Sequence, residues 1–108
     1  MVDVTFVDAG GERRTVVARD GSTLMEAAIE HDVAGIVAFC GGMCACGTCH
    51  CYVRPEWAGR LPAADDNEAD TLRRVLDRRA DSRLACQITL GAALDGLTVD
   101  LPSRQRTP

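Results

Sequence analysis

The chain has 108 residues, of which 46% are hydrophobic and 26% are charged, and its formal net charge is −4. This length and composition predict one globular domain over residues 1–108, with residues 103–108 as a loose C-terminal tail. The negative charge argues against a nucleic-acid partner, because phosphate binding needs a basic face. No apolar run approaches the roughly 20 residues of a membrane span, and no secretory signal is visible. We therefore expect a cytoplasmic monomer without a membrane partner.

The first part of the chain predicts a β-hairpin followed by a helix. Residues 2–6 alternate apolar and polar side chains, residues 9–11 contain a glycine turn, and residues 15–18 form the returning strand. Thr23 and Glu26 have the spacing of a capping box. The apolar residues that follow keep helical spacing, so we expect the main helix there.

The second part predicts further strands and a second helix. Residues 51–53 form a short strand that Pro55 ends, and residues 66–79 form a helix with an acidic start. Residues 84–90 and 97–101 are the closing strands, separated by glycines. Together these elements predict an α+β protein with a mixed sheet over one main helix and a second short acidic helix.

Six cysteines dominate the chemistry of this sequence, and four of them follow the spacing Cys40-x5-Cys46-x2-Cys49-x36-Cys86. Three thiolates on one short loop, with a fourth from far along the chain, suit an iron–sulfur cluster. Small residues separate the loop cysteines and let backbone N–H groups point at the sulfur atoms. These supporting residues are Gly41, Gly42, Ala45, Gly47 and Thr48.

Other uses of cysteine fit this pattern less well. Five of the six cysteines fall within twelve residues, too close together to staple distant parts of a fold by disulfides. Structural zinc usually shows two short knuckles, whereas a single Cys-x2-Cys pair occurs here. A Rieske centre needs two histidine ligands, and His31 lies in the predicted helix, far from the cysteine loop.

Two segments resemble a known family. Residues 40–50 read Cys-Gly-Gly-Met-Cys-Ala-Cys-Gly-Thr-Cys-His, and residues 82–88 read Ser-Arg-Leu-Ala-Cys-Gln-Ile. These motifs resemble the [2Fe-2S] ferredoxins of the adrenodoxin and putidaredoxin type, and the similarity extends over nearly the whole chain. The resemblance implies a β-grasp, ubiquitin-like ferredoxin fold. It also implies four ligands to a [2Fe-2S] cluster, with Cys40 and Cys46 on the outer iron and Cys49 and Cys86 on the inner one.

The charges of the second helix have two interpretations. Acidic residues at a helix start and basic residues at its end simply complement the helix dipole. In the resembled family, however, the acidic turn at this place docks basic patches of redox partners. On that pattern Asp66, Glu68 and Asp70 are expected to form an exposed docking turn.

Several single residues carry further expectations. By the family pattern, His50 links the cluster loop to the acidic helix by a hydrogen bond, and Arg104 and Arg106 belong to the partner-facing surface. Arg83 is expected to be a structural salt-bridge partner. Cys44 and Cys51 are not needed for four-thiolate ligation, and we expect them to be small buried hydrophobes.

The resemblance implies an electron carrier, and two roles remain open. The first is a shuttle between an FAD-dependent, NAD(P)H-oxidising ferredoxin reductase and a cytochrome P-450 monooxygenase, favoured by residues 40–42 and 99–105. The second is electron supply for iron–sulfur cluster assembly, favoured by Cys44 and Cys51. Phe39 and Arg106 depart from some monooxygenase partners. An enzyme is disfavoured, because four cysteine ligands would leave no iron open to substrate.

Overall fold

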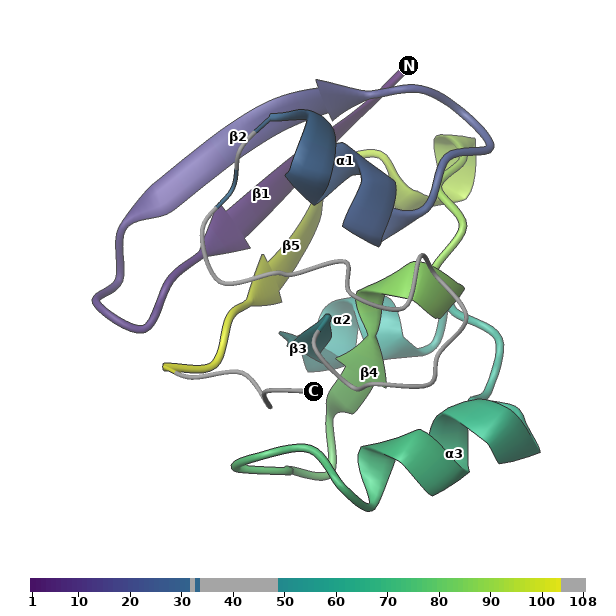
Figure 1. The fold of residues 1–108 in the computed structure, drawn as a ribbon. Coiled ribbons are helices and arrows are strands. Elements are labelled where there is room, and N and C mark those ends of the chain that lie inside the picture. The colour runs from purple at the N-terminus through teal and green to yellow at the C-terminus, as the bar shows by residue number, and fades with distance from the viewer. Residues whose placement is uncertain (32, 34–48, 104–108) are drawn as a thin grey trace.

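The computed structural model describes residues 1–31, 33 and 49–103. In this part of the chain, five strands form one mixed sheet in the order β2-β1-β5-β3-β4 (Figure 1). The strands are β1 (Val2–Val7), β2 (Arg13–Ala18), β3 (His50–Val53), β4 (Ser82–Leu84) and β5 (Leu97–Asp100). The helices are α1 (Leu24–Glu30), α2 (Pro55–Ala58) and α3 (Asp66–Leu72), with 3-10 turns η1 (Ala85–Gln87) and η2 (Ala92–Leu94).

The predicted N-terminal hairpin is confirmed. β1 pairs antiparallel with β2, and the turn between them includes Gly11 in the left-handed region at φ 87°, where glycine is favoured. β5 then pairs parallel with the other edge of β1. The alternating residues Val4 and Phe6 of β1 are buried, as their pattern predicts.

The main helix α1 begins at the predicted capping box. The Thr23 hydroxyl accepts a hydrogen bond from the Glu26 N–H at 3.1 Å, and the Glu26 carboxylate accepts one from the Thr23 N–H at 3.1 Å. Leu24, Met25, Ala27 and Ala28 are buried. Figure 1 shows α1 lying across one face of the sheet. The predicted mixed sheet over one main helix is therefore present.

Replacing Thr23 with alanine is expected to lower the free energy of unfolding by about 1 kcal/mol, because the Glu26 N–H loses its cap. Urea unfolding followed by circular dichroism would measure the change. Thr98→Ala is a suitable control, since the Thr98 hydroxyl donates to the carbonyl of Gly96, just before β5, and caps no helix. An equal effect of both substitutions would contradict the capping role.

The predicted second helix is too long. α3 ends at Leu72, and Asp77 adopts a left-handed conformation at φ 56°, which a continuing helix does not allow. The Tyr52 hydroxyl donates a 2.6 Å hydrogen bond to the Asp77 carbonyl. This contact from β3 holds the chain after α3 in a turn, although Val75 remains buried and preserves the apolar pattern.

The predicted strand over residues 84–90 is also wrong in its middle. β4 ends at Leu84, and the η1 turn follows, because the Ala85 N–H bonds the Cys49 carbonyl at 2.9 Å. Beyond η1, three backbone hydrogen bonds join residues 88–90 to residues 21–24, before and at the start of α1. We call residues 85–90 the β4–α1 arm, because they connect the end of β4 to the residues before and at the start of α1. Cys86 lies in this arm, which is hydrogen-bonded to other parts of the chain at both ends.

The remaining strand predictions are confirmed. Residues 51–53 lie in β3, and most of 97–101 lies in β5. Pro55 ends β3 as predicted, but it also begins α2 at the position where a helix tolerates proline. No helix within residues 1–31, 33 and 49–103 is long and apolar enough to cross a membrane.

Candidate metal centre

Two of the four predicted ligands lie within the described residues, and the fold brings them together. Cys49 directly precedes β3 and Cys86 lies in η1, and both side chains are buried. The Cys49 side chain lies close enough to Cys86 for the two to interact. The bond from the Ala85 N–H to the Cys49 carbonyl fixes the two backbones side by side.

The electrostatics of this pair fit metal ligands better than reactive thiols. The hydrogen bond with Cys86, together with burial, raises the pKa of the Cys49 thiol far above its ordinary value. A thiol of this kind is a poor nucleophile, whereas a metal ion can replace its proton on binding. Cys49, Cys51 and Cys86 are all free of disulfides. The donor set present therefore fits half of a four-thiolate site.

The β4–α1 arm holds the Cys86 side of this site. The Leu24 N–H donates to the Ile88 carbonyl at 2.9 Å, and the Leu90 N–H donates to the Ser22 carbonyl at 2.8 Å. The Gln87 amide nitrogen lies 3.5 Å from the Cys86 sulfur and donates a hydrogen bond to it. A donor at a ligand sulfur stabilises added negative charge and so raises the reduction potential.

The rest of the predicted cluster loop lies outside the described residues. This holds for Cys40, Cys46 and the extra thiol Cys44. It also holds for the supporting residues Gly41, Gly42, Gly47 and Thr48. In residues 1–31, 33 and 49–103, no group of three His, Cys, Asp or Glu side chains forms a metal site. The half-site of Cys49 and Cys86 is what the described structure contributes.

The prediction that Glu68 belongs to an exposed acidic turn is wrong, since its residue is only 1% exposed. Its two carboxylate oxygens accept hydrogen bonds from the Arg83 guanidinium at 2.7 and 3.0 Å. The Leu84 N–H donates a third bond at 3.0 Å. Glu68 thus anchors α3 to β4, and the structural role predicted for Arg83 is confirmed. Asp66 and Asp70 are exposed, as predicted.

His50 is buried beside the half-site. Its Nε2 lies 2.7 Å from the Ser82 hydroxyl, and its ring packs edge-on against Tyr52 with ring centres 4.8 Å apart. Burial lowers the pKa of His50 to about 4, and the Arg79 charge adds to this effect. The side chain of His50 therefore joins the start of β3 to the start of β4. The sequence predicts a hydrogen bond from His50 to the acidic helix. The hydrogen bond of its Nε2 is instead with Ser82, which lies after α3 in the chain.

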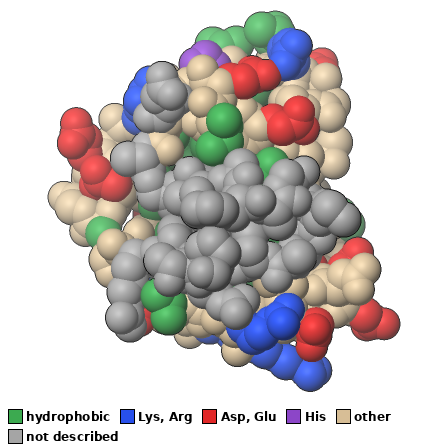
Figure 2. Space-filling view, in the orientation of Figure 1, with side chains coloured by type: hydrophobic (Ala, Val, Ile, Leu, Met, Phe, Trp, Pro, Cys, Tyr) green, Lys and Arg blue, Asp and Glu red, His purple; other side chains and the backbone are tan. Residues whose placement is uncertain are grey.

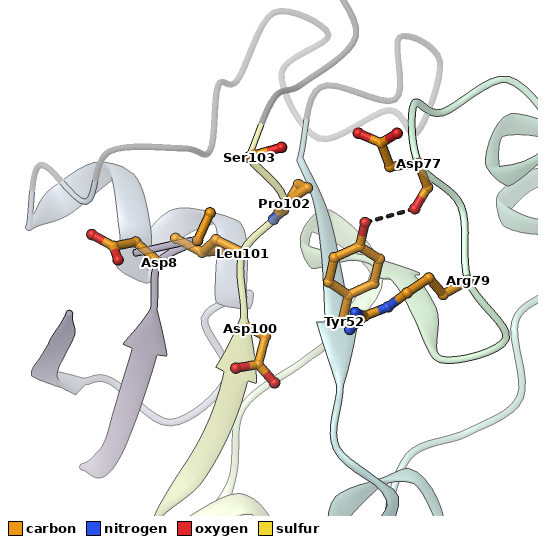
Figure 3. Close-up of a pocket in the computed structure, with 9 residues that line it drawn as sticks. Asp8, Tyr52, Asp77, Arg79, Asp100, Leu101, Pro102 and Ser103 are labelled. Atoms are coloured by element: carbon orange, nitrogen blue, oxygen red, sulfur yellow. Dashed lines mark hydrogen bonds between the residues drawn. The ribbon is translucent and has the colours of Figure 1, made fainter. Parts of the chain in front are cut away.

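Tyr52 continues this row of contacts to the surface. The Arg79 guanidinium lies 3.5 Å from the centre of its ring, and the Tyr52 hydroxyl bonds Asp77 (Figure 3). These side chains line an open groove of about 680 Å³, together with Pro102 and Ser103, which follow β5. Arg104 and Arg106, predicted for the partner-facing surface, lie outside the described residues.

Cys51 is fully buried in the core, as expected for a small hydrophobe. Burial raises the pKa of its thiol to about 12, so it stays protonated at neutral pH. Two site residues were missed in the sequence, Ser82 and Tyr52. The motif at residues 82–88 contains Ser82, but nothing in a linear pattern shows that its hydroxyl meets His50.

The sequence is similar to those of known iron–sulfur proteins. Residues 7–91 match the family model described as a 2Fe-2S iron-sulfur cluster binding domain. The chain is 49% identical over 104 residues to ferredoxin CarAc of a Sphingomonas species, covering 96% of this chain and 95% of that protein. It is 41% identical over 106 residues to putidaredoxin of Pseudomonas putida, covering 97% and 99%.

Solved structures give the same picture. A reduced putidaredoxin from Pseudomonas putida with one cysteine-to-serine substitution has a TM-score of 0.93 at 40% identity, covering 95% of this chain and 98% of that chain. Putidaredoxin in a covalent complex with putidaredoxin reductase has a TM-score of 0.91 at 40% identity, covering 94% and 99%. The ISC-like ferredoxin FdxB of Pseudomonas putida has a TM-score of 0.80 at 34% identity, covering 100% and 98%.

Proposed function

We propose a partner pair for this chain. The chain belongs to the [2Fe-2S] ferredoxins of the adrenodoxin and putidaredoxin type, has their β-grasp fold and carries electrons through a [2Fe-2S] cluster. Proteins of this family are electron carriers and not enzymes in the usual sense. The proposed donor is an NAD(P)H-oxidising flavoprotein ferredoxin reductase, and the proposed acceptor is a cytochrome P-450 monooxygenase. A nicotinamide donor releases two electrons as hydride. Because the cluster carries one electron at a time, this chain would deliver electrons twice in each turnover of the monooxygenase.

Cys40, Cys46, Cys49 and Cys86 are the proposed cluster ligands. The buried, neighbouring thiols of Cys49 and Cys86 support this assignment, and the spacing of Cys40 and Cys46 completes it. The cluster supplies one-electron chemistry when bound. Cys49 and Cys86 would hold the cluster on the side of β3 and η1, and Cys40 and Cys46 would supply the other two ligands.

Similarity to putidaredoxin over nearly the full length is the observation that supports the proposed partner pair. A putidaredoxin reductase complex is among the similar structures, and the chain is more similar to putidaredoxin than to the ISC-like ferredoxin FdxB. The 0.80 TM-score of FdxB and the extra thiols keep cluster assembly as the second candidate. In both functions the carrier accepts an electron from a donor and passes it to an acceptor, so a functional assay must separate the two.

Reconstitution tests the proposed function. The purified carrier, a ferredoxin reductase and a monooxygenase from the same source would be mixed with NAD(P)H, and product formation would be measured with and without the carrier. Carrier-dependent turnover supports the proposal. Failure to sustain any monooxygenase of that source, combined with support of cluster formation on a scaffold protein, would transfer the role to cluster assembly.

Asp66 and Asp70 are the proposed docking residues for the reductase, whereas Glu68 is buried and does not reach the surface. Replacing both with asparagine is expected to slow reduction by the reductase roughly tenfold at low salt, since steering by opposite charge raises encounter rates. Stopped-flow bleaching of the cluster would measure the rate. The loss should shrink as salt approaches 1 M, where the Debye length is about 3 Å. An equal loss at every ionic strength would mean that α3 was damaged.

The C-terminal end is a further candidate for docking. Pro102 and Ser103 line the groove beside Tyr52 and Arg79. Arg104 and Arg106 follow them directly in the sequence. We therefore keep these two arginines in the proposed partner-facing surface.

A further inference from the structure

Four arginines follow α3 and form what we call the arginine surface. Arg73 and Arg74 come at the end of the helix, and Arg78 and Arg79 come after the turn at Asp77. All four are exposed. Figure 2 shows arginine side chains together at the lower edge of the molecule, beside acidic ones, where Figure 1 draws the end of α3.

Neutralisation within the chain accounts for only half of this surface. Arg74 pairs with Asp70 at 3.8 Å, and Arg79 pairs with Asp81 at 3.3 Å. Among the described residues, no carboxylate lies within 4.0 Å of the Arg73 or Arg78 guanidinium. The helix dipole also explains little of Arg78, since α3 ends six residues before it and the dipole effect is confined to the last turn.

The backbone under these arginines is fixed. Val75 is buried in the core, and the Asp77 carbonyl accepts the Tyr52 hydroxyl at 2.6 Å. The Arg79 N–H donates to the Ser82 hydroxyl at 2.8 Å, and the Ser82 N–H donates to the Arg79 carbonyl at 3.1 Å. A fixed charged surface loses less conformational entropy on docking than a mobile one.

The same contacts place Arg79, one member of the arginine surface, close to the half-site. Ser82, which holds Arg79, also lies 2.7 Å from Nε2 of His50, and His50 is the neighbour of Cys49 in the chain. Tyr52 connects the two from the other side, with its ring against His50 and its face under Arg79. A partner docked here would approach the cluster through two packed side chains.

We propose that the arginine surface is a second docking site, which receives an acidic patch on a redox partner. Its charge is opposite to that of Asp66 and Asp70 and to the net charge of the chain, so the two surfaces select partners of opposite sign. This inference rests on the proposed function, because it requires that the chain exchanges electrons with protein partners. The surface itself is defined without knowing which partners these are.

Protein-film voltammetry tests the inference without any partner. The holoprotein would be studied on gold electrodes coated with a carboxylate-terminated film, which presents acidic groups, and with an amine-terminated film. At about 10 mM salt, where the Debye length is about 30 Å, the wild-type chain should exchange electrons on the carboxylate film. Replacing Arg73 and Arg78 together with glutamine should slow that exchange roughly tenfold.

Matched variants separate local docking from net charge. Arg13→Gln with Arg14→Gln removes the same two charges from β2, at the opposite edge of the sheet from β4, and should leave the carboxylate-film rate unchanged. The Arg73/Arg78 variant should keep its rate on the amine film, where Asp66→Asn with Asp70→Asn should be slow. The visible spectrum would show that every variant retains its cluster.

Three outcomes would overturn the inference. The first is equal rates for wild type and the Arg73/Arg78 variant on the carboxylate film, and the second is an equal loss in the Arg13/Arg14 control. The third is exchange on the amine film alone, which removes the second surface while the electron-carrier function stands. If no one-electron wave occurs on either film, the proposed function fails together with the inference.

Discussion

Replacing Cys86 with serine is expected to cost the protein at least about tenfold in cluster content, since even residues that only orient a metal ligand are worth about 10- to 100-fold in affinity. Serine keeps the size of the side chain but supplies no soft sulfur ligand. The β4–α1 arm holds residue 86 against Cys49, so no nearby residue can replace it without breaking the bonds to Ser22 and Leu24. Iron and acid-labile sulfide per chain, with visible absorption, measure the effect.

Cys51→Ser is the matched control for this substitution. Cys51 is also fully buried and lies two residues from Cys49, but we assign it no ligand role. The variant should keep its full cluster, although burying a hydroxyl in place of the thiol lowers the stability of the fold. Loss of the cluster from Cys51→Ser, or its retention by Cys86→Ser, would contradict the ligand assignment.

Glu68→Gln is expected to lower the free energy of unfolding by about 3 kcal/mol, because removing one partner of a buried ion pair strands the other charge. The Arg83 guanidinium, whose side chain is only 15% exposed, would lose its bidentate partner. The hydrogen bond to Glu68 raises the pKa of Arg83, so the contact favours the charged form of the guanidinium. Chemical unfolding of the holoprotein measures the change.

Two companion variants sharpen this prediction. Glu56→Gln removes an exposed carboxylate at the start of α2 and should change stability little. Replacing Glu68 and Arg83 together with methionine should recover much of the loss, since buried ion pairs can be exchanged for apolar side chains of similar volume. A double variant as unstable as Glu68→Gln would place the effect in the Leu84 N–H bond instead of the ion pair.

Local patterns predicted most of the fold. The hairpin, the capping box at Thr23 and the strands at β3 and β5 depend on residues within a few positions of one another, and all are confirmed. The end of α3 was missed because the apolar spacing continues through Val75, while the turn at Asp77 depends on Tyr52, 25 residues earlier in the chain. The turn at Cys86 was missed for the same reason, since it depends on the Cys49 carbonyl.

The candidate site divides in the same way. The cysteine spacing predicts a cluster, and the comparisons with known proteins confirm the cofactor. The prediction of an exposed Glu68 follows from the family resemblance, which implies an acidic docking turn at this place in the chain. Its burial depends on Arg83, 15 positions away, whose guanidinium extends from β4 to the Glu68 carboxylate on α3. A linear pattern contains charge and spacing but not the partner that makes burial of a charge possible.

The place of β5 in the sheet has a consequence for the folding of the protein. β5 lies between β1 and β3, so without it the sheet consists of two separate antiparallel pairs of strands, β2–β1 and β3–β4. Its residues 97–100 pair in parallel with residues 4–7, far away in the sequence. Such distant pairing makes folding slow. The two pairs of strands become one sheet only when β5 inserts between them, so the insertion of β5 is the step that joins the β3–β4 pair, which adjoins Cys49 and Cys86, to the rest of the fold.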